Sequence, residues 1–174
     1  MALSPPELLT ADHHVSQFAC GKPALDLWLK TRALSNQKKG FTVVMVVHDD
    51  GRVVGYYGLA LTAVAPTGMP RSIRTGQPPN PLPCLLLGQL ATDRDWMGKG
   101  IGTGLLRHAL MRSVEGANLV GGRALLVNAL DEEAALFWQR QGFVASVDNP
   151  FILYRSMSDI AASLSKAGAK SPSE

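Results

Sequence analysis

A chain of 174 residues with 46% hydrophobic and 18% charged residues is typical of one soluble globular domain with a sizeable core. No apolar run approaches the roughly 20 residues that a membrane-spanning helix needs, and the N-terminal MALSPPELL lacks the basic residues of a secretory signal. The two separated cysteines, Cys20 and Cys84, indicate a disulfide only weakly, so a reducing, cytoplasmic location is the simpler interpretation.

The net charge of +3 is concentrated in the first part of the chain. Residues 1–74 hold eight Lys/Arg against five Asp/Glu, whereas residues 75–174 hold nine against nine. The basic residues cluster on or beside one predicted helix: Lys22, Lys30, Arg32, Lys38 and Lys39. Such a stripe can bind nucleic acid phosphates, and it can equally be an ordinary solvated helix face.

The N-terminal half predicts a helix, a hairpin and a long loop. Apolar residues recur at helical spacing over 23–38, with Pro23 in the first turn and Gly40 at the end. Residues 41–64 predict a β-hairpin, because Asp50–Gly51 is a strong two-residue turn signal between β-branched runs. The proline-rich segment 66–83 predicts a surface loop long enough to be functional.

The C-terminal half alternates strands and helices. The predicted strands are 84–92, 123–130, 143–146 and 151–157; the predicted helices are 99–114 and 131–141, the first broken by Gly116, Gly121 and Gly122. Residues 158–174 predict a C-terminal tail, a short helix followed by a frayed, disordered end. This order predicts an α/β fold, a single domain over residues 1–157 with a mixed central sheet of six to seven strands flanked by helices.

The segment LATDRDWMGKGIGTGLL, residues 90–106, predicts an anion site. Gly98, Gly100, Gly102 and Gly104 alternate where a buried strand passes into a helix. Glycine allows close approach to the backbone, and the helix start offers free N–H groups and the positive end of a dipole. Phosphate or pyrophosphate is the usual ligand of such a site.

Three phosphate ligands compete for this loop. A dinucleotide fingerprint needs G-x-G-x-x-G soon after the first strand, and a Walker A loop needs G-K-[ST] at its end; neither pattern fits. The third ligand is coenzyme A, with its pyrophosphate on the loop and its pantetheine along the preceding strand.

The segments LGQLATDRDWMGKGIGTGLLRHAL and LLVNALDEEAALFWQRQGF resemble the acetyl-CoA motifs of the GNAT superfamily of N-acetyltransferases. FACGKPALDLWLKTRALSNQKKG, VVGYYGLA, NPLPCLLL and VDNPFILYRSM further resemble the GNAT toxins of bacterial toxin–antitoxin pairs. That group acetylates aminoacyl-tRNA, and its partner is a ribbon-helix-helix antitoxin. The resemblance covers residues 5–157 and also implies a homodimer.

The resemblance implies which residues bind acetyl-CoA. Backbone groups of the strand would hold the pantetheine arm, loop amides would hold the pyrophosphate, and Met97 occupies a position that is usually Gln or Arg. The implied acetyl-CoA-binding residues are Leu90, Ala91, Thr92, Met97, Gly98, Lys99, Gly100, Ile101, Gly102, Thr103, Gly104, Asp131 and Phe137.

The family's usual tyrosine, which protonates the departing thiolate, is replaced by Trp138. An indole N–H cannot act as a general acid, although it can donate a hydrogen bond or pack in the core. Tyr154 on the last predicted strand is a candidate replacement acid or a core tyrosine. A thiolate with a pKa near ~8.5 can also take its proton from water.

The acceptor is less constrained than the donor. An α-amino group, with a pKa of roughly 7.7–8.0, is partly neutral at pH 7, so the lack of an evident base favours an α-amine. Gln89 and Val43 stand where the toxin group often carries arginine, which weakens the case for RNA. The alternatives are an acetyltransferase for a small amine or a protein, and a weakly active acyl-CoA-binding module.

The histidines, at positions 13, 14, 48 and 108, show no metal-ligand spacing beyond one sequential pair. The pair His13–His14 predicts surface positions, and His108 an exposed or structural one. The sequence therefore predicts no metal site.

Overall fold

The computed structural model describes residues 3–169. Seven strands form one mixed sheet in the order β1-β2-β3-β4-β5-β7-β6, which confirms the predicted α/β class. The chain divides into two compact units, residues 1–60 with 87–109 and residues 61–86 with 110–174, and the two are described separately. Within residues 3–169, no helix combines the length and the apolar character needed to cross a membrane.

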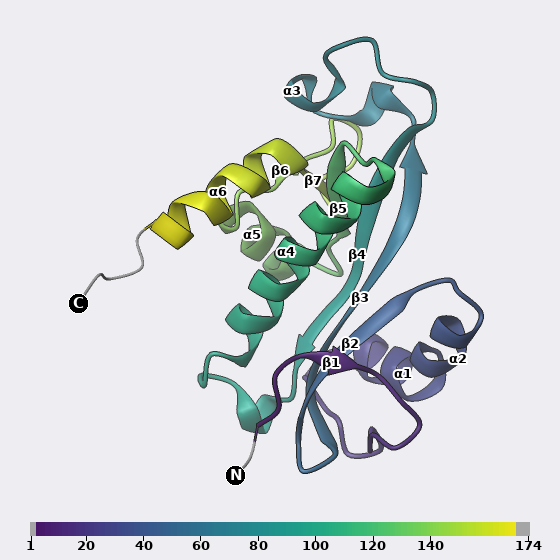
Figure 1. The fold of residues 1–174 in the computed structure, drawn as a ribbon, viewed down its shortest axis with the longest axis vertical. Helices are drawn as coiled ribbons and strands as arrows, with labels where there is room; N and C mark the ends of the chain where they lie inside the picture. Colours follow the sequence, from purple (N-terminus) through teal and green to yellow (C-terminus); the bar gives the residue numbers. More distant parts are fainter. Residues whose placement is uncertain (1–2, 170–174) are drawn as a thin grey trace. The chain divides into compact units, whose positions relative to one another are not determined.

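The first unit contains the N-terminal segment, the hairpin and the loop that leads into α4 (Figure 1). Its elements are β1 (Glu7–Leu8), α1 (Pro23–Thr31), α2 (Ala33–Lys38), β2 (Val43–Asp49), most of β3 (Arg52–Val64), the end of β4 (Leu82–Thr92), the 3-10 turn η2 (Arg94–Trp96) and the start of α4 (Ile101–Val120). Its core consists of Leu9, Phe18, Cys20, Leu29, Ala33, Val44, Val46, Val53, Tyr56 and Ala91.

The hairpin prediction is confirmed. Asp50 and Gly51 adopt positive φ angles of 47° and 90°, and Asp49 pairs with Arg52 across the turn. Two residues in this conformation match the right-handed twist of the flanking strands, which is why Asp-Gly is favoured there. The strand β1 was not predicted, because two residues are too few to show an alternating pattern.

The predicted helix over 23–38 is two helices. Arg32 separates α1 from α2 with φ −122° and ψ −32°, outside the helical range. Leu29 before the break and Ala33 after it both enter the core, so the break lets two short helices cover the same apolar face. In Figure 1 these helices lie beside β2.

The second unit contains the proline-rich loop and the C-terminal elements. These are the end of β3, η1 (Pro66–Gly68), α3 (Arg71–Arg74), the start of β4, the rest of α4, β5 (Ala124–Asn128), α5 (Glu132–Arg140), β6 (Val144–Ala145), β7 (Ile152–Ser156) and α6 (Met157–Ala169). The strand β7 pairs antiparallel with both β5 and β6. The core consists of Met69, Ile73, Leu82, Cys84, Ala124, Leu126 and Tyr154.

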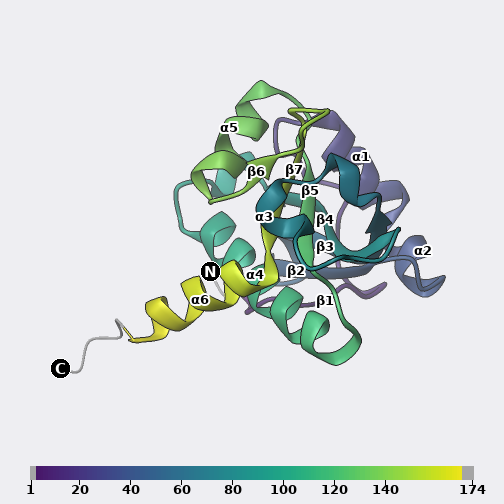
Figure 2. The same cartoon turned by 90° about the horizontal axis from the view of Figure 1, so that it is seen from above.

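The predicted end of one helix in this unit was wrong. The helix α4 continues through Gly116 to Val120. A Cβ at residue 116 would lie 3.3 Å from the Leu85 side chain, so glycine avoids a tight contact at this position. The C-terminal helix α6, labelled in Figure 2, has 13 residues. Its Met157 and Ile160 side chains are buried. The predicted frayed end at 170–174 lies outside the described residues.

Candidate active site

The glycine loop joins β4 to α4 within the first unit. Gly98 and Gly100 have φ angles of +77° and +84°, in the left-handed region that side chains disfavour. A Cβ built on either residue would meet no atom within 4 Å. Glycine is therefore favoured at these two positions by the backbone conformation, and not by a lack of space for a side chain.

The start of α4 leaves a short run of amides for an anion. The Gly104 N–H donates to the Gly100 carbonyl at 3.0 Å, which is the first hydrogen bond of the helix. The preceding N–H groups, of Ile101, Gly102 and Thr103, are those that helix geometry leaves without a partner in the helix. The twenty-residue α4 adds the positive end of its dipole at the same place. The amides available to a pyrophosphate are therefore fewer than the whole run from 98 to 104.

The remaining loop and strand residues have distinct environments. Thr92 ends β4 against the first turn of α4, since its Oγ1 lies 3.3 Å from the Cβ position of Gly102. The Lys99 Nζ lies 5.1 Å from the centre of the Trp96 ring, a cation–π contact. Ala91 is buried, Leu90 is half-buried and Met97 is exposed.

The other predicted site residues belong to the second unit. Asp131 is the N-cap of α5, where its carboxylate accepts from the Ala134 N–H at 2.8 Å. Trp138 is 7% exposed and makes edge contacts with Phe137 and Phe143, at centroid distances of 5.0 and 5.1 Å. These contacts are those of a packed core aromatic.

Tyr154 is a core tyrosine of the second unit. Its side chain is 4% exposed and belongs to the apolar cluster that contains Cys84. Burial raises the pKa of the Tyr154 phenol above its usual value, and Cys84 adds to the increase. A phenol with a raised pKa gives up its proton less readily, so this environment does not favour Tyr154 as the general acid.

The two cysteines are buried and free. Burial raises the pKa of the Cys20 thiol to about 11 and raises the pKa of Cys84 as well. Both thiols are therefore protonated at neutral pH, and neither is an activated nucleophile.

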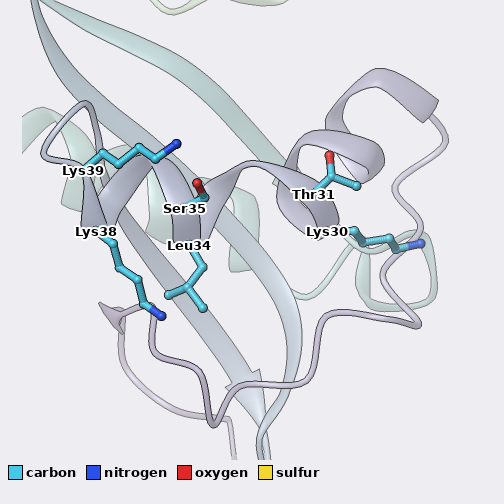
Figure 3. Close-up of a pocket in the computed structure, with 6 residues that line it drawn as sticks. All are labelled: Lys30, Thr31, Leu34, Ser35, Lys38 and Lys39. Carbon is cyan, nitrogen blue, oxygen red and sulfur yellow. The ribbon is translucent and has the colours of Figure 1, made fainter.

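A basic groove of about 400 Å³ lies along α1 and α2 (Figure 3). Its lining residues are Lys30, Thr31, Leu34, Ser35, Lys38 and Lys39. The groove gathers three residues of the predicted basic stripe beside two hydroxyl groups. The Thr31 hydroxyl donates to the Leu27 carbonyl at 2.7 Å, so the donors that suit phosphate oxygens are the three ammonium groups and the Ser35 hydroxyl.

The two positions where arginine is absent lie elsewhere in the same unit. Val43 begins β2 and is exposed. Gln89 lies on β4 with its Oε1 buried and without a hydrogen-bond partner among the described residues. A Cβ at Gly58 would clash with that oxygen, so glycine at 58 provides the space for the Gln89 side chain.

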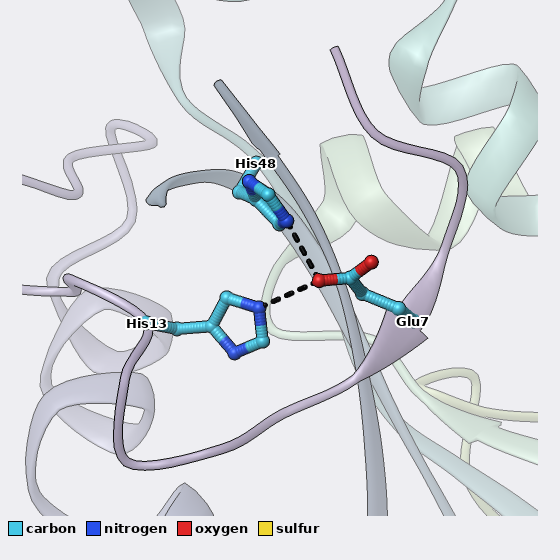
Figure 4. Close-up of side chains that lie close together, drawn as sticks. All are labelled: Glu7, His13 and His48. Atoms are coloured by element: carbon cyan, nitrogen blue, oxygen red, sulfur yellow. Dashed lines mark hydrogen bonds and ion pairs between the residues drawn. The ribbon is translucent and has the colours of Figure 1, made fainter. Parts of the chain in front are cut away.

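A cluster of Glu7, His13 and His48 was missed by the sequence reasoning (Figure 4). The Nε2 atoms of His13 and His48 lie 2.9 and 2.6 Å from Glu7 Oε1. The surface prediction was wrong for His13, whose side chain is 8% exposed. His108, on α4, bonds through Nδ1 to the Tyr57 hydroxyl at 2.7 Å, a structural position.

The hydrogen bonds of the cluster indicate a clip and not a metal site. The Nδ1 atom of His13 accepts from the Thr10 N–H, and that of His48 accepts from the Gly51 N–H, both at 2.9 Å. The ring protons therefore lie on Nε2 and point at Glu7. A histidine that binds a metal through one ring nitrogen usually donates a hydrogen bond through the other. Here the other nitrogen, Nδ1, instead accepts a hydrogen bond from a backbone N–H group. The clip holds the edge strand β1 to its neighbour β2.

Replacing Glu7 with glutamine is expected to cause a pH-dependent loss of stability. Hydrogen bonds from His13 and then His48 lower the pKa of Glu7 below its usual value. The stabilising contribution is complete above the unfolded pKa of roughly 4.3 and is lost as the pH falls through the lower folded value. Thermal unfolding of the wild-type protein and of Glu7→Gln across pH 2–8 should show a difference in melting temperature that vanishes at the acid end.

Asp12→Asn, at an exposed carboxylate of the same segment, is the control for a general charge effect. It should show a small difference with little dependence on pH. A Glu7→Gln difference that persists unchanged at pH 2 would contradict the clip.

A loop with two left-handed glycines between a strand and a helix start, in this α/β fold, fits a ligand that carries a phosphate or pyrophosphate group, as coenzyme A does. Residues 40–145 match the acetyltransferase (GNAT) domain family. The chain is 40% identical over 159 residues to the tRNA-acetylating toxin of Mycobacterium tuberculosis (strain ATCC 25618 / H37Rv), which covers 91% of this chain and 95% of the toxin. The chain therefore belongs to the GNAT acetyltransferases, in the branch that includes this toxin.

Two solved structures are similar over almost the full length. AtaT in complex with acetyl-methionyl-tRNAfMet has a TM-score of 0.84 and 29% identity, covering 94% of this chain and 99% of AtaT. An AtaT variant bound to the C-terminus of the antitoxin AtaR and to acetyl-CoA has a TM-score of 0.79 and 28% identity, covering 95% and 99%. The likeness thus extends beyond residues 40–145 into the N-terminal segment.

Proposed function

We propose that this protein is a toxin that transfers an acetyl group from acetyl-CoA to the α-amino group of aminoacyl-tRNA. The likeness to the mycobacterial tRNA-acetylating toxin over 91% of the chain carries the proposal. The basic groove on α1 and α2 supports it, because it offers phosphate-binding groups outside the acetyl-CoA loop. That groove lies before residue 40, in the region that the general GNAT match does not cover.

The chain's residues would act mainly by holding the two substrates. The N–H groups at the start of α4 would bind the pyrophosphate, and the β4 residues from Leu90 to Thr92 would fix the pantetheine arm. Acetyl-CoA supplies the thioester. The acceptor amine must be neutral to attack, and an α-amine meets this need near pH 8 without a strong base. Catalysis would then depend on orientation and on backbone N–H groups that polarise the carbonyl.

The partners form the second part of the proposal. The structure of AtaT with the C-terminus of AtaR supports an antitoxin for this chain as well, and we assign it to the ribbon-helix-helix type. A homodimer in the cytoplasm completes the assignment. Size measurement in solution and co-purification with the product of a neighbouring small gene would check both.

Expression of the protein without its antitoxin should arrest growth, and acetylated aminoacyl-tRNA should be recoverable from the arrested cells. Full growth with no acetylated tRNA would contradict the proposal. Turnover on a panel of free amines that added tRNA leaves unchanged would favour the small-amine or protein acetyltransferase. Binding of coenzyme A without transfer to any amine would favour the acyl-CoA-binding module.

Replacing Trp138 with tyrosine is expected to raise kcat by about tenfold or more, because a phenol supplies the general acid that indole cannot. The matched control is Trp138→Phe, which has the same ring without the hydroxyl. Both variants leave space beside Phe137 and Phe143 and should lose a similar ~1 kcal/mol or more of stability. Single-turnover acetylation rates provide the comparison, and equal rates for the two variants would mean that thiolate protonation needs no side chain.

A further inference from the structure

Asp93 is a buried carboxylate placed between β4 and the glycine loop. It is 1% exposed. Its Oδ1 accepts from the Asp95 N–H at 3.0 Å and its Oδ2 from the Ala19 N–H at 3.1 Å. The first bond caps the turn η2, while the second reaches a residue 74 positions earlier in the chain.

The backbone beside Asp93 is bonded to the same segment. The Arg94 N–H donates to the Ala19 carbonyl at 2.9 Å, so both polar groups of Ala19 are bound by residues 93–94. The Asp93 N–H itself donates to the Val54 carbonyl at 2.8 Å. The chain therefore leaves β4 in a direction fixed from two sides, only a few residues before Gly98.

A charge contact reinforces this arrangement. The Nη2 atom of Arg52 lies 3.7 Å from Asp93 Oδ2, and the Arg52 Nε is buried without a hydrogen-bond partner among residues 3–169. A buried carboxylate is costly unless it accepts hydrogen bonds or pairs with a cation. Asp93 meets that cost through Ala19, Asp95 and Arg52, so its position depends on all of them.

The segment that Asp93 holds leads directly into α1. The next amide, of Cys20, donates to Asp26 Oδ1 in the first turn of that helix at 2.9 Å. Two consecutive N–H groups are thus bound by different parts of the unit. That of Ala19 is bound by Asp93 before the glycine loop, and that of Cys20 is bound by Asp26 in α1. The connection runs from the glycine loop through Ala19 and Cys20 to the helices that carry the basic groove.

We infer that Asp93 is a positioning residue that sets the acetyl-CoA loop and couples it to the acceptor-binding helices through Ala19. The inference rests on the proposed function, which assigns the loop to acetyl-CoA and the groove to RNA. Binding of an RNA at α1 and α2 restrains these helices, and the hydrogen bonds of Cys20 and Ala19 pass that restraint to Asp93 and the loop. Each substrate therefore tightens the binding of the other.

Asp93→Asn tests this directly, because the amide keeps one acceptor oxygen and loses the charge and the second acceptor. Calorimetry would measure the Kd of coenzyme A, which cannot donate an acetyl group, with and without saturating unfractionated aminoacyl-tRNA. The wild-type protein should bind coenzyme A about fivefold more tightly when the tRNA is present. Asp93→Asn should raise the Kd about tenfold and remove the effect of tRNA.

Asp26→Ala is the matched control, since it removes the other hydrogen bond of the same segment without touching the loop. It should lower the melting temperature and leave the Kd of coenzyme A within about twofold of the wild type, because the bond from Ala19 remains. If Asp93→Asn does not fold, Arg52→Gln tests the same connection by withdrawing only the partly exposed charge. It should raise the Kd about threefold.

The loop variant Gly104→Asp distinguishes a failure of the proposed function from a failure of the inference about Asp93. If it binds coenzyme A as the wild type does, the loop is not the acetyl-CoA site and the proposed function loses its donor site. If it loses binding while Asp93→Asn keeps the wild-type Kd and the effect of tRNA, the inference about Asp93 is overturned and the proposed function stands. Absence of any tRNA effect in the wild type would overturn the coupling.

Discussion

Replacing Gly104 with aspartate is expected to raise the Kd of acetyl-CoA by roughly a hundredfold while leaving the fold at least as stable. A Cβ at residue 104 meets no atom within 4 Å, and its backbone is helical. Aspartate in the first turn of a helix interacts favourably with the dipole and replaces a poor helix former. The same carboxylate repels the phosphates that the neighbouring amides would bind.

Gly104→Ala is the control, because it adds a Cβ without a charge. It should raise the free energy of unfolding by up to about 1 kcal/mol, and with it the melting temperature. It should change the Kd far less than aspartate does. Isothermal titration with coenzyme A and thermal unfolding together measure the two effects. Equal affinities for the aspartate and alanine variants would mean that no phosphate lies near this turn.

Reversing the charge at two positions of the groove, with Lys38→Glu and Lys39→Glu together, is expected to reduce aminoacyl-tRNA acetylation by about a hundredfold. Each lysine that contacts a phosphate contributes roughly 0.7–0.9 to the slope of log K against log salt, so the slope should fall by about 1.5. Both lysines line the groove on the solvent side of α2. Acetylation of a small amine should be unchanged, because the acetyl-CoA loop keeps its sequence.

Lys166→Glu, at an exposed lysine on α6, controls for a charge reversal outside the groove. Filter binding and acetylation at several salt concentrations would compare the variants. If the double variant retains the wild-type salt slope, the RNA site does not lie on α1 and α2, and these lysines belong to an ordinary solvated helix face.

Local chemistry made the turns and the loop predictable. The backbone is left-handed at Asp50–Gly51, Gly98 and Gly100. Because glycine is the residue that favours this conformation, it can be predicted from the local sequence without knowledge of the rest of the fold. The break at Arg32 could not be predicted in this way, because no glycine or proline marks it. It arises from the packing of Leu29 and Ala33 on one core, which only the folded chain defines.

The missed features depend on residues that are distant in sequence. Glu7, His13 and His48 meet because β1 pairs with β2, and nothing in their spacing signals that pairing. The bond between Asp93 and Ala19 spans 74 positions. Helix propensity alone predicts a break at Gly116, whereas the helix continues through this residue, which lies close to the Leu85 side chain.

The open space around Gly104 also has a consequence for the inheritance of such a toxin. A single base change converts a glycine codon into one for aspartate or glutamate, and at this position the product would fold normally. Under the proposed function, a cell with that allele would make an inactive protein that still binds the proposed antitoxin and still reaches its normal abundance. Suppressor mutants selected for survival should therefore include full-length, folded proteins altered at residue 104, alongside truncations and unstable variants.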